Sequence, residues 1–271
     1  MTFPSNSRIG PWIRPGLWRG FALLTAGALM LMTTPAFSLS IELNQVKYGQ
    51  TFPLAGGKAG GVPKGYSGGG SLGGVMKNAE QVWETAITDK DRVLLNFGWG
   101  TLEYKVLGQT TVSGKKATLV FNNKRRDWFI DKTPFKNQEF GPLRTKRATI
   151  DGKTMNSARY NKALSGGPAD DRFDLVTVAR HEVGHGVGAS FHLKAEIKNL
   201  DQALLVPSLP PGMRRDITTV DAWATADQAG HDSYHQYRVY ATPLPASLPL
   251  AATAFGALGM IAARRRRKTA A

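Results

Sequence analysis

Apolar residues recur at helical spacing in two stretches of this 271-residue chain. The first stretch predicts an amphipathic helix over residues 75–88, with apolar positions Val75, Ala79, Val82, Trp83 and Ala86. The second predicts a helix over residues 172–187, with apolar positions Leu175, Val176, Ala179, Val183 and Val187. Asp170 and Asp171 stand where the N-cap of the second helix is expected, and Gly186 and Gly188 stand where that helix should end.

Strands are predicted where short apolar runs are bounded by turn residues. Residues 92–99 predict a buried strand, and residues 101–107 and 117–121 predict two more, the last one ending at the turn-forming pair Asn122-Asn123. Residues 122–170 are polar and rich in Lys, Asn, Gly and Pro, so we expect irregular structure there.

Ten glycines lie between residues 55 and 74, at positions 56, 57, 60, 61, 65, 68, 69, 70, 73 and 74. A stretch of this composition has little to bury and disfavours a helix, so we expect a flexible loop over residues 55–74. A phosphate-binding loop is the alternative interpretation, but no Gly-Lys-Ser or Gly-Lys-Thr follows the glycines.

The amino-terminal end has the organisation of a secretory signal peptide. Residues 1–38 contain three arginines and no acidic residue, then an apolar run from Phe21 to Met32, then small residues that include Ala36 and Ser38. The apolar run is too short for a membrane anchor. We therefore expect export, cleavage after Ser38, and a single folded domain over residues 39–242.

The carboxyl-terminal end, residues 243–271, begins with Pro-Leu-Pro-Ala-Ser, continues with an apolar run at 248–263 and ends in a cluster of four arginines and a lysine. The run is long enough for a marginal transmembrane segment, with the basic cluster on the cytoplasmic side. This arrangement resembles the C-terminal sorting signal of the PEP-CTERM type, in its Pro-Leu-Pro-Ala variant. The resemblance implies a Gram-negative cell-envelope protein that a sorting transpeptidase of the inner membrane recognises. Such a protein is held in the membrane by this segment at least before processing, and is afterwards anchored or released to the surface or extracellular matrix.

The charge and the missing cysteines exclude several classes of function. The formal charge is +15, and removing eight of the 35 basic residues, those of the two terminal segments, leaves 27 against 20 acidic residues, or +7. No nucleic-acid recognition motif accompanies this moderate charge, so we expect no nucleic-acid partner. Without cysteine the chain has no disulfide, no thiol nucleophile and no cysteine-based zinc finger.

The second predicted helix contains the motif His181-Glu182-Val183-Gly184-His185. Histidines four residues apart lie on one face of a helix, where both imidazoles can reach one ion, and zinc accepts imidazole nitrogen. Glu182 lies beside this face, where it could accept a proton from a water molecule that the metal activates. The motif therefore predicts a Zn²⁺ site with a general base. A pair of solvated helix histidines is the alternative, and it leaves Gly184 and Gly188 unexplained.

Residues 174–188 resemble the active-site helix of the zincin metallopeptidases, in particular metzincin-like bacterial envelope enzymes that carry a PEP-CTERM tail. The resemblance implies that His181 and His185 bind zinc, that Glu182 is the catalytic base and that Gly188 redirects the chain. It also implies peptide-bond hydrolysis and an α+β, zincin-like fold in which a twisted sheet packs on the active-site helix. A looser resemblance covers residues 83–88, 92–100 and 106–110.

The third zinc ligand is left open by the sequence. The metzincin pattern places it at Phe191, so His192 comes one position late, and a bulge after Gly188 would bring it into place. We take His192 as the first choice. The alternatives are His231, His235, Glu196, Asp201 and Asp221.

Two further features of metzincins have candidates in this chain. Met213 lies in a turn-rich stretch and is the candidate for the methionine turn beneath the metal. A tyrosine hydroxyl could stabilise the developing oxyanion, and Tyr234, Tyr237 and Tyr240 are the candidates downstream.

Three functions are therefore compared. The first is an exported zinc metallopeptidase that cleaves protein or peptide substrates. The second is a non-catalytic envelope or matrix protein with a structural or degenerate zinc site. The third is a membrane-tethered binding module, which predicts no metal.

Overall fold

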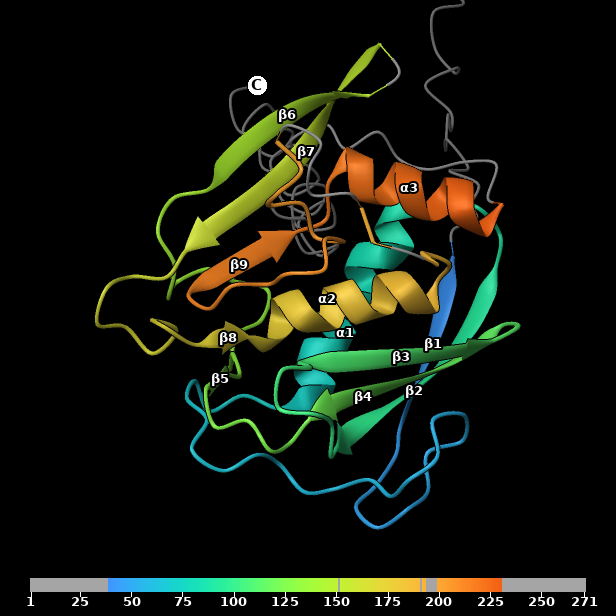
Figure 1. The fold of residues 1–271 in the computed structure, drawn as a ribbon, viewed down its shortest axis with the longest axis vertical. Helices are drawn as coiled ribbons and strands as arrows, with labels where there is room; N and C mark the ends of the chain where they lie inside the picture. Colours follow the sequence, from blue (N-terminus) through green and yellow to red (C-terminus); the bar gives the residue numbers. More distant parts are fainter. Residues whose placement is uncertain (1–38, 151, 191, 194–198, 231–271) are drawn as a thin grey trace, which may run out of the picture. The chain divides into compact units, whose positions relative to one another are not determined.

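The computed structural model describes residues 39–150, 152–190, 192–193 and 199–230, which all lie in one compact unit, Phe37–Ala271. The predictions for residues 1–38 and 243–271 lie outside the described residues. Within them the chain has a mixed α+β architecture (Figure 1). The elements are, in order, β1 (Ser40–Gln45), α1 (Leu72–Ala86), β2 (Arg92–Gly100), β3 (Gly108–Ser113), β4 (Lys116–Asn122), β5 (Trp128–Phe129), β6 (Arg144–Ile150), β7 (Lys153–Lys162), β8 (Phe173–Asp174), α2 (Leu175–Gly186), β9 (Met213–Asp216) and α3 (Thr219–Ala229).

The first sheet has the strand order β1-β2-β4-β3. Strands β1, β2 and β4 are parallel, and β3 runs antiparallel to β4 at the edge. Helix α1 contacts β1, helix α2 contacts β2, β3 and β4, and the two helices contact each other, so both cover one face of this sheet. A smaller cluster around Phe52 and Val120 packs on the sheet away from the main core. Strand β2 is covered on both sides, which explains its almost continuous apolar sequence.

Helices α1 and α2 approach each other closely at Trp83. The indole Nε1 of Trp83 donates to the carbonyl oxygen of Arg180 at 2.7 Å, and Trp83 is fully buried. A Cβ at Gly184 would lie 2.7 Å from the Trp83 ring and 2.7 Å from a Leu205 methyl group. The glycine inside the His-Glu-x-x-His motif is therefore a packing requirement of α2.

A second sheet, with the order β6-β7-β9, is antiparallel and contacts α3 through β7 (Figure 1). It corrects the expectation of irregular structure over residues 122–170. Its strands were missed because charged and polar residues occupy most of β6, with a register shift between Lys146 and Arg147 that interrupts any alternation. The strand expected at 101–107 is also wrong, because the edge strand begins only at Gly108.

Helix α2 begins later than the sequence predicted. Its N-cap is Asp174, whose carboxylate accepts from the backbone N–H of Thr177 at 3.1 Å. Asp170 instead accepts from the backbone N–H of Gly166, and Asp171 has a φ of 51°. Phe173 and Asp174 are not helical because they pair with β5. The strands at 92–99 and 117–121 and the first helix are confirmed to within a few residues.

The sequence predicted a flexible loop over the whole glycine-rich segment, but the carboxyl-terminal end of this segment is structured. Ser67 and Gly69 form β-bridges with Phe129 and Asp131, and Gly73 and Gly74 lie in the first turn of α1, which Ser71 caps. A Cβ at Gly70 would lie 2.0 Å from the carbonyl oxygen of Asp131. Here glycine serves the close approach of two backbones.

None of the described helices has the length and apolar character needed to cross a membrane.

Candidate metal centre

Helix α2 places three polar side chains of the motif in the interior of the fold. His181 and Glu182 are buried, at 5% and 6% exposure, and His185 is partly buried. The helix is fixed at its start by the Asp174 cap and along its length by apolar residues such as Val183. After the helix the chain turns at Gly188, whose φ is 133° and where a Cβ would lie 2.2 Å from the Cβ of Ala229. This turn brings His192 back toward the helix.

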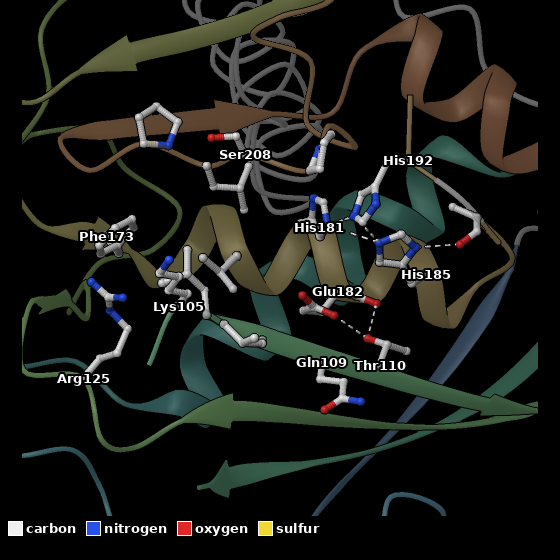
Figure 2. Close-up of a pocket in the computed structure, with 18 of the residues that line it drawn as sticks. Lys105, Gln109, Thr110, Arg125, Phe173, His181, Glu182, His185, His192 and Ser208 are labelled. Atoms are coloured by element: carbon white, nitrogen blue, oxygen red, sulfur yellow. Dashed lines mark hydrogen bonds between the residues drawn. The ribbon is translucent and has the colours of Figure 1, made fainter. Parts of the chain in front are cut away.

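Three imidazoles converge on one point (Figure 2). The Nε2 atom of His181 lies 3.1 Å from that of His185 and 3.1 Å from that of His192, and the His185 and His192 Nε2 atoms are 3.3 Å apart. Among the described residues these histidines form the group that can hold a metal ion. The structure thus brings together the two motif histidines and the first-choice third candidate.

The cluster fits a bound metal ion, with zinc as one example, by two observations. Nitrogens bound tetrahedrally at about 2.0–2.1 Å are about 3.3 Å apart, close to the three separations seen here. The second ring nitrogens face carbonyl oxygens: Nδ1 of His181 lies 2.8 Å from the Leu204 oxygen, and Nδ1 of His185 lies 2.6 Å from the Ala189 oxygen. A carbonyl can only accept, so both Nδ1 atoms carry the proton and both Nε2 lone pairs face the common point.

The environment keeps the imidazoles neutral. Burial, followed by the neighbouring His185, lowers the pKa of His181 to about 3. Burial also lowers the pKa of His185, and burial together with His185 lowers that of His192. At neutral pH the three rings therefore offer lone pairs, as metal binding requires.

Glu182 has the environment of a proton-transfer group. Burial raises its pKa to about 7, against a smaller lowering by the hydrogen bond from Thr110. The Thr110 hydroxyl lies 2.7 Å from a carboxylate oxygen of Glu182 and 3.1 Å from its backbone oxygen. Gly108 of β3 makes room for this carboxylate, since a Cβ there would lie 2.8 Å from the Glu182 Cγ. The edge strand therefore orients the carboxylate.

The histidines and Glu182 open into one cavity of about 1060 Å³. Its walls come from β3, from the preceding loop, from α2 and from residues 207–211. Glu182 is the one carboxylate among the described residues that line it. The cluster thus has an open side, as a reactive site needs.

The other candidates from the sequence are not part of the cluster. Asp201 pairs with Lys146, and Asp221 is fully buried with hydrogen bonds to Leu205 and Thr218. Met213 packs with Ala158 and Tyr160 between β7 and β9, so the expectation of a methionine floor there is wrong. Phe191, Glu196, His231, His235 and the tyrosines Tyr234, Tyr237 and Tyr240 lie outside the described residues.

Sequence reasoning missed the residues that hold the cluster in place. The Leu204 and Ala189 carbonyls orient two imidazoles, and Thr110 orients Glu182. Backbone carbonyls leave no mark in a sequence. Thr110 could have been suspected only as a hydroxyl in a segment of loose resemblance.

Comparison of the chain with protein-family models, with curated proteins and with solved structures found no match. Function is therefore inferred from the chain's own residues.

Proposed function

We propose that the protein is a zinc-dependent metallopeptidase in which His181, His185 and His192 bind Zn²⁺ and Glu182 is the general base. The observation that carries the proposal is the convergence of three neutral imidazoles beside a buried carboxyl group in one open cavity. The likeness of residues 174–188 to the zincin active-site helix supports the same assignment.

Zinc, Glu182 and Thr110 have separate roles in the proposed hydrolysis. Zinc, when bound, supplies a Lewis acid that polarises a carbonyl and acidifies water. Glu182 accepts the proton of the attacking water and delivers it to the departing amine. Thr110 holds the carboxylate toward the cavity during both steps.

A peptide is the substrate that the cavity suits best. Strand β3 is the edge of the first sheet, and Gly108, Gln109, Thr110 and Val112 from it line the cavity. An extended peptide can pair with such an edge through backbone hydrogen bonds and so lie across the metal.

A structural zinc site in a non-catalytic protein is the second candidate. Structural zinc sites are closed by four protein ligands, whereas catalytic sites have three and an open position. The described residues provide three histidines, and His192 is exposed to the cavity. This favours catalysis. A membrane-tethered binding module without a metal would leave the convergent imidazoles unexplained.

The location is also a proposal. The signal-peptide pattern in residues 1–38 and the PEP-CTERM-like tail support export to a Gram-negative envelope and recognition by a sorting transpeptidase. A cleavage assay before and after removal of the tail by such an enzyme would show whether the released form is the active one.

The experiment is cleavage of an unfolded protein such as casein by the purified protein. We expect cleavage that a zinc chelator abolishes and that added zinc restores. Zinc-loaded, folded protein that cleaves no unfolded substrate would contradict the proposal.

A further inference from the structure

The cavity extends well beyond the metal centre. Figure 2 shows the histidines beside the carboxyl-terminal half of α2, while Lys105, Arg125 and Phe173 line the same cavity toward the start of the helix. Nothing in the hydrolytic chemistry requires two cations at that end. These two cations therefore suggest a role in binding the substrate.

Arg125 is a fixed cation. It is 8% exposed, and its guanidinium carbon lies 4.3 Å from the centre of the Phe173 ring and 4.9 Å from that of Tyr104. Its Nε and Nη2 groups donate to Asp127, and its Nη1 donates to the Tyr104 carbonyl oxygen. Three of its five N–H groups are thus engaged, and two are left for a ligand. Asp127 offsets part of the charge but does not line this cavity.

Lys105 supplies a charge that is not offset. Its side chain is exposed, and it takes part in none of the ion pairs among the described residues. Since Glu182 is the one carboxylate among the described lining residues, the end of the cavity near Lys105 is positive. A charge in a low-dielectric cleft attracts the opposite charge more strongly than it would on an open surface.

Apolar residues also line the cavity. Val106 and Leu107 follow Lys105 in the chain, Val178 precedes His181 on α2, and Leu209 lies in the segment 207–211. A substrate side chain that extends from the metal centre along these apolar residues needs apolar methylene groups. Where it reaches Lys105 and Arg125, it needs an anionic group. Glutamate has both features.

We propose that the cavity selects peptides with an acidic side chain, glutamate above all, close to the cleaved bond, and that Lys105 and Arg125 are the residues that determine this specificity. The proposal rests on the metallopeptidase function proposed above. The carboxylate binds the Lys105 ammonium and the two remaining N–H groups of Arg125, while the methylene groups of the side chain pack on the apolar residues that line the cavity.

The test uses peptides that differ only in one residue, Glu, Gln or Lys, placed in turn at each of the three positions on either side of the cleaved bond. Exposed ion pairs contribute up to about 1 kcal/mol, so at one position we expect kcat/KM for Glu to exceed that for Gln by about fivefold and that for Lys by more. The preference should shrink as salt is added.

The decisive variant is Lys105→Glu, with Lys153→Glu as the matched control, because Lys153 is an exposed lysine of β7 that does not line the cavity. Both variants change the net charge equally. We expect Lys105→Glu to favour the Lys peptide over the Glu peptide and Lys153→Glu to behave as the wild type. Equal kcat/KM for all wild-type peptides, or an unchanged preference in Lys105→Glu, would overturn the inference. Failure of the wild type to cleave any peptide would instead overturn the metallopeptidase function.

Discussion

At the scale of single residues, the fold buries ionisable side chains of the site where their charged forms are unfavourable. Glu182 is buried beside three imidazoles and receives one side-chain hydrogen bond, from Thr110. Ionising such a carboxyl costs free energy, which is why its pKa rises to about 7. Enzymes tolerate groups of this kind where proton transfer requires them.

The stability of the metal-free protein should report this cost. The pKa of Glu182 is about 7 in the folded protein, above the ordinary 4.5 expected in the unfolded chain. The contribution of protonated Glu182 to the free energy of unfolding is therefore fully present below pH 4.5 and is lost as the pH rises to 7. Gln cannot ionise. In chelator, Glu182→Gln should match the wild type near pH 4 and exceed it by about 3 kcal/mol above pH 7. Denaturant unfolding at several pH values measures the difference, and a constant difference across this range would contradict the raised pKa.

Asp221 is connected to the candidate metal centre through the backbone. It accepts from the backbone N–H of Leu205 at 3.0 Å and from the backbone N–H and hydroxyl of Thr218. Leu205 follows Leu204, whose carbonyl orients His181. Asp221 therefore fixes the backbone that sets the direction of the His181 lone pair.

Asp221→Ala should weaken zinc binding by less than the about tenfold to hundredfold that loss of a direct hydrogen-bond partner of a metal ligand costs, because Asp221 acts on His181 only through the backbone at Leu204 and Leu205. Asp201→Ala is the control, because Asp201 lies in the same connecting segment as Leu204 and its carboxylate pairs with Lys146 at the surface. Competition with a zinc-binding dye gives both affinities on protein whose folding is checked by circular dichroism. Equal affinities for the two variants would show that Asp221 has no part in positioning His181.

At the scale of elements, the contact between α1 and α2 determines where the histidines lie. A Cβ at Gly184 would lie 2.7 Å from both Trp83 and Leu205, whereas a Cβ at Gly73 in the first turn of α1 would have only the Gln45 side-chain oxygen near it, at 3.7 Å. Both glycines are helical.

This difference gives opposite expectations for the same substitution. Gly184→Ala should destabilise the protein by about 1–3 kcal/mol, because the new methyl group overlaps its neighbours. Gly73→Ala should be neutral or stabilising by up to about 1 kcal/mol, because alanine is the better helix former. Thermal unfolding of the two variants checks this. A Gly184→Ala protein as stable as the wild type would mean that α1 and α2 are not packed as described.

The elements also show what sequence can and cannot predict. Strand β2 and helix α2 were predictable because a buried strand and an amphipathic helix leave strong apolar patterns. The hairpin of β6 and β7 was not, because the largely exposed β6 is rich in Lys, Arg and Thr, and the buried half of β7 contains the polar residues Ser157, Arg159 and Asn161. The start of α2 was misplaced because the pairing of Phe173 and Asp174 with β5 is a tertiary contact.

The same reasoning explains the outcome at the metal centre. Two ligand positions and the neighbouring carboxylate follow from helix geometry alone, so His181, Glu182 and His185 were predictable. The convergence of His192 depends on the turn at Gly188, where both the φ of 133° and the close approach of Ala229 from α3 favour glycine. The expectation for Met213 failed because a turn-rich sequence does not reveal which core cluster a turn joins.

At the scale of the whole molecule, the centre is assembled from segments far apart in the chain. Thr110 comes from the edge strand, the motif from α2, and His192 and Leu204 from the connection to β9. The site therefore exists only in the folded protein, and bound zinc would link α2 to the segment after it.

The most direct measurement of the central claim is the rate of peptide cleavage by zinc-loaded wild type and by zinc-loaded Glu182→Gln at neutral pH. General acid–base catalysis contributes about 10² to 10⁴ in rate, so the variant should bind one zinc ion per chain and cleave at least about a hundredfold more slowly. If the variant binds zinc and cleaves at the wild-type rate, Glu182 is not the general base and the mechanism is wrong.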